Sequence, residues 1–196
     1  MRELDFADYN EKLSKSGRET LALAIEESRR RGQNYLDAGH LFIAAAKIEA
    51  QALEKSILEL GLNPKSVLKD IEDHVDRSKK YGGQGLKITF SMKTIFKLAF
   101  SHSSQSGRSN IEARDLLMAI FAEENNVPIE VFRAKGVGPD KVRSTLGYHF
   151  EGVRSKEGAP DLPGRHTYVF ATPMGIMAGI VLLLLVIFLL VMFLSG

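Results

Sequence analysis

Apolar and polar residues follow one another through most of the chain with the period of an α-helix. Between residues 21 and 28, apolar or small side chains recur at i, i+3, i+4 and i+7, and the stretch ends at Gly32. Residues 41–48 are apolar on nearly every side, which is typical of a buried central helix. A third apolar stripe covers 50–60, and residues 63–64 (Asn-Pro) supply the cap and first-turn proline of a fourth helix. No alternating pattern of useful length predicts a strand, so this region is predicted to be all-α.

The helical pattern occurs twice. An offset of 75 residues aligns segment 16–71 with segment 91–146 without a gap. Turn and apolar residues keep one register, as these pairs show: Ala24 with Ala99, Gly32 with Gly107, Leu41 with Leu116, Gly61 with Gly136 and Pro64 with Pro139. This period is longer than the repeats of common solenoids, so each copy is predicted to be a four-helix unit that packs on its twin. We place copy one at about 12–77 and copy two at about 87–147, within a domain of residues 1–147.

The last part of the chain has a different character. Residues 148–172 include prolines and several glycines and predict a flexible linker. No charged residue follows Arg165, and 174–194 is an uninterrupted apolar run of 21 residues. As a helix, this run reaches roughly 32 Å, enough to cross a hydrocarbon core of about 30 Å. We therefore predict one transmembrane helix, a C-terminal tail anchor at 173–196.

Charge and composition add an orientation and exclude several functions. Lys and Arg lie before the predicted span and none lies after it, which favours a single-pass membrane protein with a cytoplasmic N-terminal domain. The N-terminal residues are charged and do not resemble a signal peptide. The absence of cysteine excludes disulfides and a cysteine nucleophile. A net charge of +2 with interspersed signs argues against a nucleic-acid partner.

The predicted span carries one packing motif. Gly175 and Gly179 form a Gly-x-x-x-Gly pattern, and Ala171 extends this row of small residues by one turn. Such a row lets two helix backbones approach closely. Because the pattern also occurs by chance in spans, two interpretations stay open: a homodimer or a docked second span, and a span that stands alone.

Three segments resemble the N-terminal domain of the Clp ATPases. They are residues 20–32, the stretch Gln33-Asn-Tyr-Leu-Asp-Ala-Gly-His-Leu-Phe-Ile-Ala44, and residues 58–68. The resemblance covers about 12–147 and is weaker in copy two. That family is a tandem of two four-helix repeats, in agreement with the duplication. The resemblance implies a docking domain for adaptors and substrates, here as a stand-alone double repeat without an ATPase module.

No motif in the chain predicts catalysis. There is no Walker sequence, no nucleophile elbow around a serine, and no histidine spacing that suits a metal. We therefore expect no enzymatic activity, no cofactor and no metal. The resemblance implies a glutamate before the histidine in each repeat of the Clp subgroup that reads phosphorylated arginine. Gly39 and Arg114 occupy those positions here, so that mode of recognition is not expected.

The duplication also suggests a binding site. We expect the seam between the copies to bring together the starts of the two central helices, where free N–H groups favour an anionic ligand. These starts carry Asp37 and His40 in copy one, and Glu112, Arg114 and Asp115 in copy two. Arg114, the only fixed cation among them, is the expected contact for an acidic side chain or a C-terminal carboxylate. In the competing interpretation, Arg114 forms a salt bridge with Glu112 or Asp115, and His40 is structural.

Two functions agree with these patterns. The first is a non-enzymatic, membrane-tethered protein-interaction module, an adaptor or receptor that serves a Clp-type ATPase or protease. The alternative is a structural accessory subunit of a membrane protein complex. Both imply protein partners and a lipid bilayer.

Overall fold

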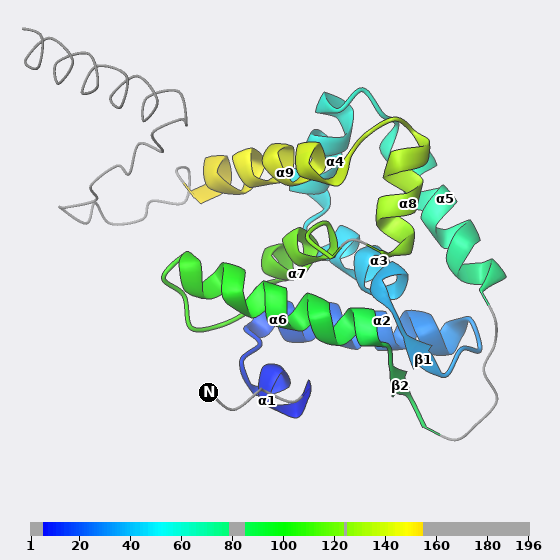
Figure 1. Cartoon of the computed structure of the whole chain (residues 1–196), viewed down its shortest axis with the longest axis vertical. Helices are drawn as coiled ribbons and strands as arrows, with labels where there is room; N and C mark the ends of the chain where they lie inside the picture. The colour runs from blue at the N-terminus through cyan, green and yellow to red at the C-terminus, as the bar shows by residue number, and fades with distance from the viewer. Residues whose placement is uncertain (1–5, 79–84, 124, 155–196) are drawn as a thin grey trace, which may run out of the picture. The chain divides into compact units, whose positions relative to one another are not determined.

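The computed structural model describes residues 6–78, 85–123 and 125–154 (Figure 1). Their elements are α1 Phe6–Glu11, α2 Lys15–Arg30, β1 Tyr35–Leu36, α3 Ala38–Ile48, α4 Ala50–Glu59, α5 Pro64–Arg77, β2 Lys87–Ile88, α6 Phe90–Gln105, α7 Ala113–Ile120, α8 Val127–Ala134 and α9 Pro139–Arg154. The helical prediction for this part of the chain is confirmed. The short helix α1 and the two-residue strands are additions that the sequence pattern does not predict.

The duplication is visible in the backbone at the helix ends. Gly32 and Gly107, which follow α2 and α6, have φ angles of 64° and 69°. Gly61 and Gly136, which follow α4 and α8, have φ angles of 76° and 79°. Other residues adopt this left-handed conformation only at a steric cost. Both pairs are 75 residues apart, so the two copies make the same turns at the same positions.

Two short parallel pairings connect the copies. Leu36 of β1 pairs with Ile88 of β2, and Leu13 forms an isolated bridge with Ile111. The offset of 75 converts Leu13 to Ile88 and Leu36 to Ile111, so one contact occurs twice about an internal two-fold axis. Each pairing is too short to produce an alternating sequence pattern, which explains why no strand is predicted there.

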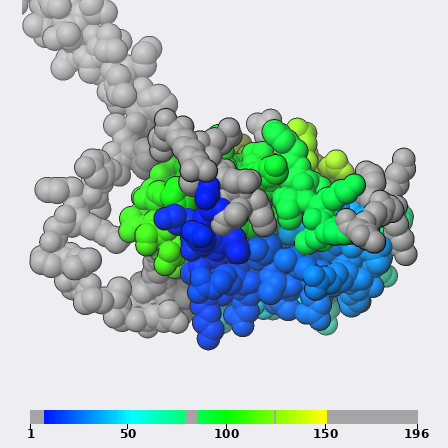
Figure 2. Space-filling model, turned by 90° about the horizontal axis from the view of Figure 1, so that it is seen from below, coloured from blue at the N-terminus to red at the C-terminus, as the bar shows by residue number. Residues whose placement is uncertain are grey.

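The copies are interlaced and do not form two separate four-helix units. Helices α3 and α7 pack against each other in the middle, where α2 covers α3 and α6 covers α7. Beyond them α4 of copy one packs on α9 of copy two, and α5 packs on α8 (Figure 1). The opposite face is formed by α2 and α6, with α1 against α6 (Figure 2). Because the outer helices exchange partners, neither copy covers its apolar faces alone.

One hydrophobic core runs through both copies. Leu41 and Leu116, which the repeat pattern predicts to be buried, are both fully buried. The ring of Phe42 in copy one meets the rings of Phe121 and Phe132 in copy two edge-on, with centroids 6.0 and 6.4 Å apart. These contacts join the copies through the largest side chains of the core.

The last helix continues past the boundary that the sequence predicts. The predicted domain ends at 147, yet α9 runs to Arg154. Val142, Leu146 and Phe150 recur every four residues and are buried. Gly147 lies inside α9 and does not end it, because the tertiary contacts of the residues around it hold the helix together.

The membrane prediction concerns a part of the chain outside the described residues. The apolar run 174–194, the small residues Ala171, Gly175 and Gly179, and the linker from 155 onward all lie there. Within the described ranges, no helix is both long and hydrophobic enough to cross a bilayer.

Candidate binding site beside helix α7

At the start of α3, His40 belongs to the buried interior, whereas Asp37 is partly exposed. His40 is fully buried, with its Nδ1 2.8 Å from Asp37 Oδ1 and its Nε2 2.6 Å from Gln33 Oε1. Gln33 donates in turn from Nε2 to the carbonyl oxygen of Val75 at 2.7 Å. Asp37 also caps α3 by accepting the backbone N–H of His40. Both ring nitrogens of His40 are therefore engaged by the protein, in agreement with the structural interpretation.

Asp115 at the start of α7 is fully buried as well. Its carboxylate accepts two hydrogen bonds of 2.6 Å from Arg108, and it contacts His102 Nδ1 at 2.6 Å. The backbone N–H of Glu112 donates to it at 2.8 Å. Burial by itself raises the pKa of Asp115, but these hydrogen bonds outweigh burial and hold the pKa below its ordinary value. Asp115 is thus a charged structural anchor.

The two copies use one pair of positions in different ways. The offset of 75 converts Gln33 to Arg108 and His40 to Asp115. Copy one therefore holds an amide–imidazole contact where copy two holds an arginine–carboxylate ion pair. Arg108 is absent from the residues expected at the site, although the offset from Gln33 could have identified it.

Arg114 is the candidate cation and remains partly accessible, as does Glu112 beside it. Its side chain is 20% exposed and forms a salt bridge with Glu112, whose Oε2 lies 2.5 Å from Arg114 Nε. This contact agrees with the competing, structural interpretation. A guanidinium group carries five N–H donors, however, and the contact with Glu112 involves only Nε and Nη2. Among the described residues, no partner engages the N–H groups of Nη1.

Arg114 also lines a small pocket. The pocket has a volume of about 80 Å³ and is lined by His102, Ser106, Arg108, Arg114, Met118 and Phe150. A buried water needs only about 10–15 Å³ of such volume, so there is room for a carboxylate-sized group. Polar groups from α6 and α7 meet apolar surface from α7 and α9 here. The lining suits a hydrogen-bond acceptor carried on an apolar stem.

Two arginines and three carboxyl groups lie around the pocket. Arg108 and Arg114 face the carboxylates of Glu112 and Asp115, and Glu49 lies close to the same group. Burial raises the pKa of Glu49, Arg114 lowers it, and the two neighbouring carboxylates raise it, with a net shift upward. Recognition at this pocket therefore depends on directed hydrogen bonds and not on a large positive potential.

The structure does not bring the two helix starts together. The start of α7 lies at the beginning of α2, where the backbone N–H of Ala113 donates to Ser16 Oγ at 3.3 Å. The start of α3 lies at the end of α2, where Ser28 Oγ donates to the carbonyl of Tyr35 at 2.7 Å. The 16 residues of α2 correspond to about 24 Å. The expected common seam is therefore wrong, because the two-fold axis makes α3 and α7 antiparallel.

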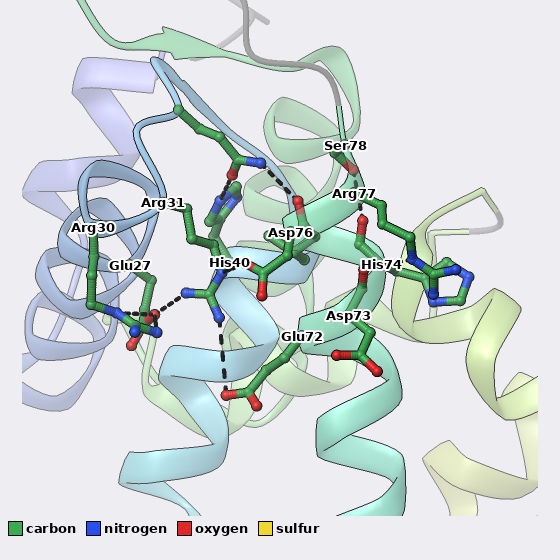
Figure 3. A network of polar contacts seen from close by, with 12 residues as sticks. Glu27, Arg30, Arg31, His40, Glu72, Asp73, His74, Asp76, Arg77 and Ser78 are labelled. Carbon is green, nitrogen blue, oxygen red and sulfur yellow. Dashed lines mark hydrogen bonds and ion pairs between the residues drawn. The ribbon is translucent and has the colours of Figure 1, made fainter.

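A second polar cluster lies near the start of α3 and connects α2 with α5 (Figure 3). Glu27 accepts hydrogen bonds from Arg30 and Arg31, and from Lys47 at 2.5 Å. Arg31 also contacts Asp76 of α5, with Nε 2.7 Å from Oδ1. Burial raises the pKa of Glu27, but the three cations outweigh it and lower the pKa from 4.5 to about 2. This network connects the end of α2 to α5 through Arg31 and to α3 through Lys47.

Comparison with known sequences points to one family. The family profile described as "Clp repeat (R) N-terminal domain" matches residues 12–135, more than half of the chain. The "Negative regulator of genetic competence ClpC/MecB" of Bacillus subtilis is 24% identical over 141 residues, which cover 72% of this chain and 17% of that protein. The chloroplastic "Chaperone protein ClpC1" of Oryza sativa is 22% identical over 136 residues, covering 69% and 15%. The chain thus spans about a sixth of the length of these relatives.

Solved structures share the fold. The N-terminal domain of Hsp104 from Candida albicans aligns with a TM-score of 0.60 and 12% identity, over 69% of this chain and 89% of that one. The N-terminal domain of the chaperone ClpD from Arabidopsis thaliana aligns with a TM-score of 0.57 and 12% identity, over 72% and 96%. At this level of identity the likeness concerns the fold alone.

Proposed function

The chain belongs to the family of Clp repeat N-terminal domains, and from this premise we propose that it is a non-enzymatic protein-interaction module. Its relatives are named as a negative regulator of genetic competence, ClpC/MecB, and as a chaperone protein, ClpC1. We propose that this chain acts as an adaptor or receptor for a Clp-type ATPase or protease. The partner is a protein, and the chain contributes a binding surface without chemistry of its own.

The observation that carries this proposal is the pocket beside α7 with its accessible arginine. Arg114 is paired with Glu112 through Nε and Nη2 and lines the pocket, and its Nη1 has no partner among the described residues. A carboxylate accepts such donors in pairs, which fixes its direction as well as its distance. Met118 and Phe150 supply an apolar wall for the stem of the same group. The proposed ligand is therefore an acidic side chain or the C-terminal carboxylate of the partner.

We propose further that the run 174–194 holds the chain in a membrane as a single span, with the N-terminal domain in the cytoplasm. Its length and its lack of charge support the span, and the Lys and Arg residues before it support the orientation. The row of Ala171, Gly175 and Gly179 offers a surface for pairing two spans in a homodimer. A tethered module would meet its partner at the membrane surface.

The test compares two charge-neutralised variants of the full chain. Membranes that contain the unaltered chain, Arg114→Gln or Arg29→Gln are crosslinked and solubilised, and the captured proteins are identified by mass spectrometry. Arg29 is an exposed arginine near the other end of α2 and serves as the matched control. We expect Arg114→Gln to lose a partner that the unaltered chain and Arg29→Gln both retain.

Equal capture by all three proteins would exclude the pocket as the binding surface. If partners then depend on the small residues of the predicted span, the alternative function as an accessory subunit of a membrane complex is supported. Replacing Gly175 and Gly179 with isoleucine tests that dependence, because larger side chains prevent close approach of two helices.

A further inference from the structure

A second, apolar groove lies on copy one, away from the pocket beside α7. Its floor is α3, and its walls are α4 and α5. The apolar residues that line it include Phe42, Ala46, Leu53, Ile57 and Leu68. The groove has a volume of about 210 Å³. Because an engineered cavity of about 150 Å³ accepts benzene, this groove has room for a large apolar side chain.

The groove lies where two side chains of copy one are smaller than their counterparts in copy two. The offset of 75 converts Ala46 to Phe121 and Ile57 to Phe132. In copy two these two rings pack edge-to-face with centroids 5.1 Å apart, and both are buried. The fold therefore does not require an opening at this place. Where copy two has Phe121, the smaller Ala46 leaves an opening in copy one.

Two opposite charges stand on the rim of the groove. Glu54 lies on the α4 wall and Lys65 on the α5 wall, and both are exposed. Among the described residues, neither has an ion-pair partner. Lys65 is in the first turn of α5, where the helix dipole disfavours a cation, whereas copy two has Asp140 there. Helix stability therefore does not explain Lys65.

We propose that this groove binds an amphipathic helix of a partner protein. The helix inserts one or two large apolar side chains and carries a basic residue beside Glu54 and an acidic residue beside Lys65. The groove is built from helices, whose backbone N–H and C=O groups already bond within each helix. Its walls therefore have no free strand edge that could form backbone hydrogen bonds with an extended peptide. A helical partner forms its backbone hydrogen bonds internally, so it needs only the apolar floor and the two rim charges.

The proposal can be tested with defined peptides and the full chain in detergent micelles. Three labelled helical peptides share leucines at i and i+4 and differ in the residues beside them: one Lys and one Glu, two Lys, or two Glu. Binding is followed by fluorescence anisotropy. We expect the mixed peptide to bind roughly three- to tenfold more tightly than the other two, because only it matches both rim charges.

Charge reversals on the rim should move this preference. Glu54→Lys makes both walls basic, so the peptide with two Glu should bind best. Lys65→Glu makes both walls acidic, so the peptide with two Lys should bind best. These exposed positions leave the core untouched, so the test does not depend on refolding. A preference that ignores both reversals would overturn the proposal.

Filling the groove tests its apolar floor. Ala46→Phe introduces the residue found at the equivalent position of copy two and should abolish binding of the mixed peptide. Ala22→Phe, at an exposed position of α2, should leave binding unchanged. A proline-containing peptide of the same composition should not bind, and equal binding by it would contradict a helical ligand. Arg114→Gln should leave peptide binding intact, which separates this groove from the pocket beside α7.

Discussion

Arg108 holds the buried carboxylate of Asp115 through two hydrogen bonds of 2.6 Å, from Nη1 to Oδ2 and from Nη2 to Oδ1. The same two positions in copy one hold Gln33 and His40, joined by one contact of 2.6 Å. Both copies of the fold therefore have a bonded pair at this place, an amide–imidazole contact in copy one and an ion pair in copy two.

We expect the loss of one partner to be costly. Asp115→His alone removes the buried one of the two carboxylates paired with Arg108 and should lower the free energy of unfolding by about 3 kcal/mol. Adding Arg108→Gln recreates the pair of copy one and should restore a large part of this loss. Urea denaturation of the single and double variants measures the difference. If the double variant loses as much free energy of unfolding as the two single variants together, the two copies are not interchangeable at this pair.

The polar cluster around Glu27 in Figure 3 predicts how stability depends on pH. The pKa of Glu27 is about 2 in the folded chain and 4.5 in the unfolded reference, so folding favours its ionised form. Its contribution is fully present above pH 4.5 and is lost as the pH falls toward 2. Glu27→Gln should therefore be less stable at pH 7, and its deficit should shrink through this window. Glu26→Gln, at the exposed neighbouring position, should keep the unaltered pH profile.

The repeated turns give a matched pair of substitutions. No atom lies within 4 Å of a Cβ added at Gly61 or Gly136, so an alanine there meets only the cost of its positive φ. Each replacement should lower the free energy of unfolding by about 1–2 kcal/mol. Gly138→Ala, where the site is equally open and φ is not positive, should be nearly neutral. Thermal denaturation that shows unequal costs at Gly61 and Gly136 would contradict equivalent turns.

Much of the fold could be predicted from the sequence because helices leave local signals. The apolar stripes, the glycines after α2 and α4, and the offset of 75 predict the helices and their duplication. The exchange of outer helices leaves no such signal, since the stripe on α4 looks the same whether it faces α5 or α9. The continuation of α9 through Gly147 depends likewise on tertiary contacts.

The candidate site is less completely predictable from the sequence than the fold, because it too depends on tertiary arrangement. The sequence identifies the charged residues at the start of α7, but the direction of α3 relative to α7 follows from the two-fold axis. His40 and Asp115 look like ligand contacts in the sequence because polar residues at helix starts are usually exposed. Their burial depends on Gln33 and Arg108, which lie in the loops before α3 and α7.

The proposed membrane span can be tested by extraction. The full chain should stay with membranes in high salt and in alkaline carbonate, because its apolar run is long enough to cross the bilayer. Two arginines in the middle of the run, as in Leu184→Arg with Val186→Arg, should release it, since each costs about 2.5–3.5 kcal/mol at that depth. Release of the unaltered chain by carbonate would rule out a transmembrane helix.

The most direct test of the central claim is photocrosslinking from inside the pocket beside α7. A photoreactive residue replaces Ser106, which lines the pocket, or Lys93, which is exposed near the opposite end of α6. We predict a protein adduct from position 106 that is missing from position 93 and disappears when Arg114→Gln is added. An adduct that forms equally at both positions, or survives the loss of the arginine, would contradict a partner site at this pocket.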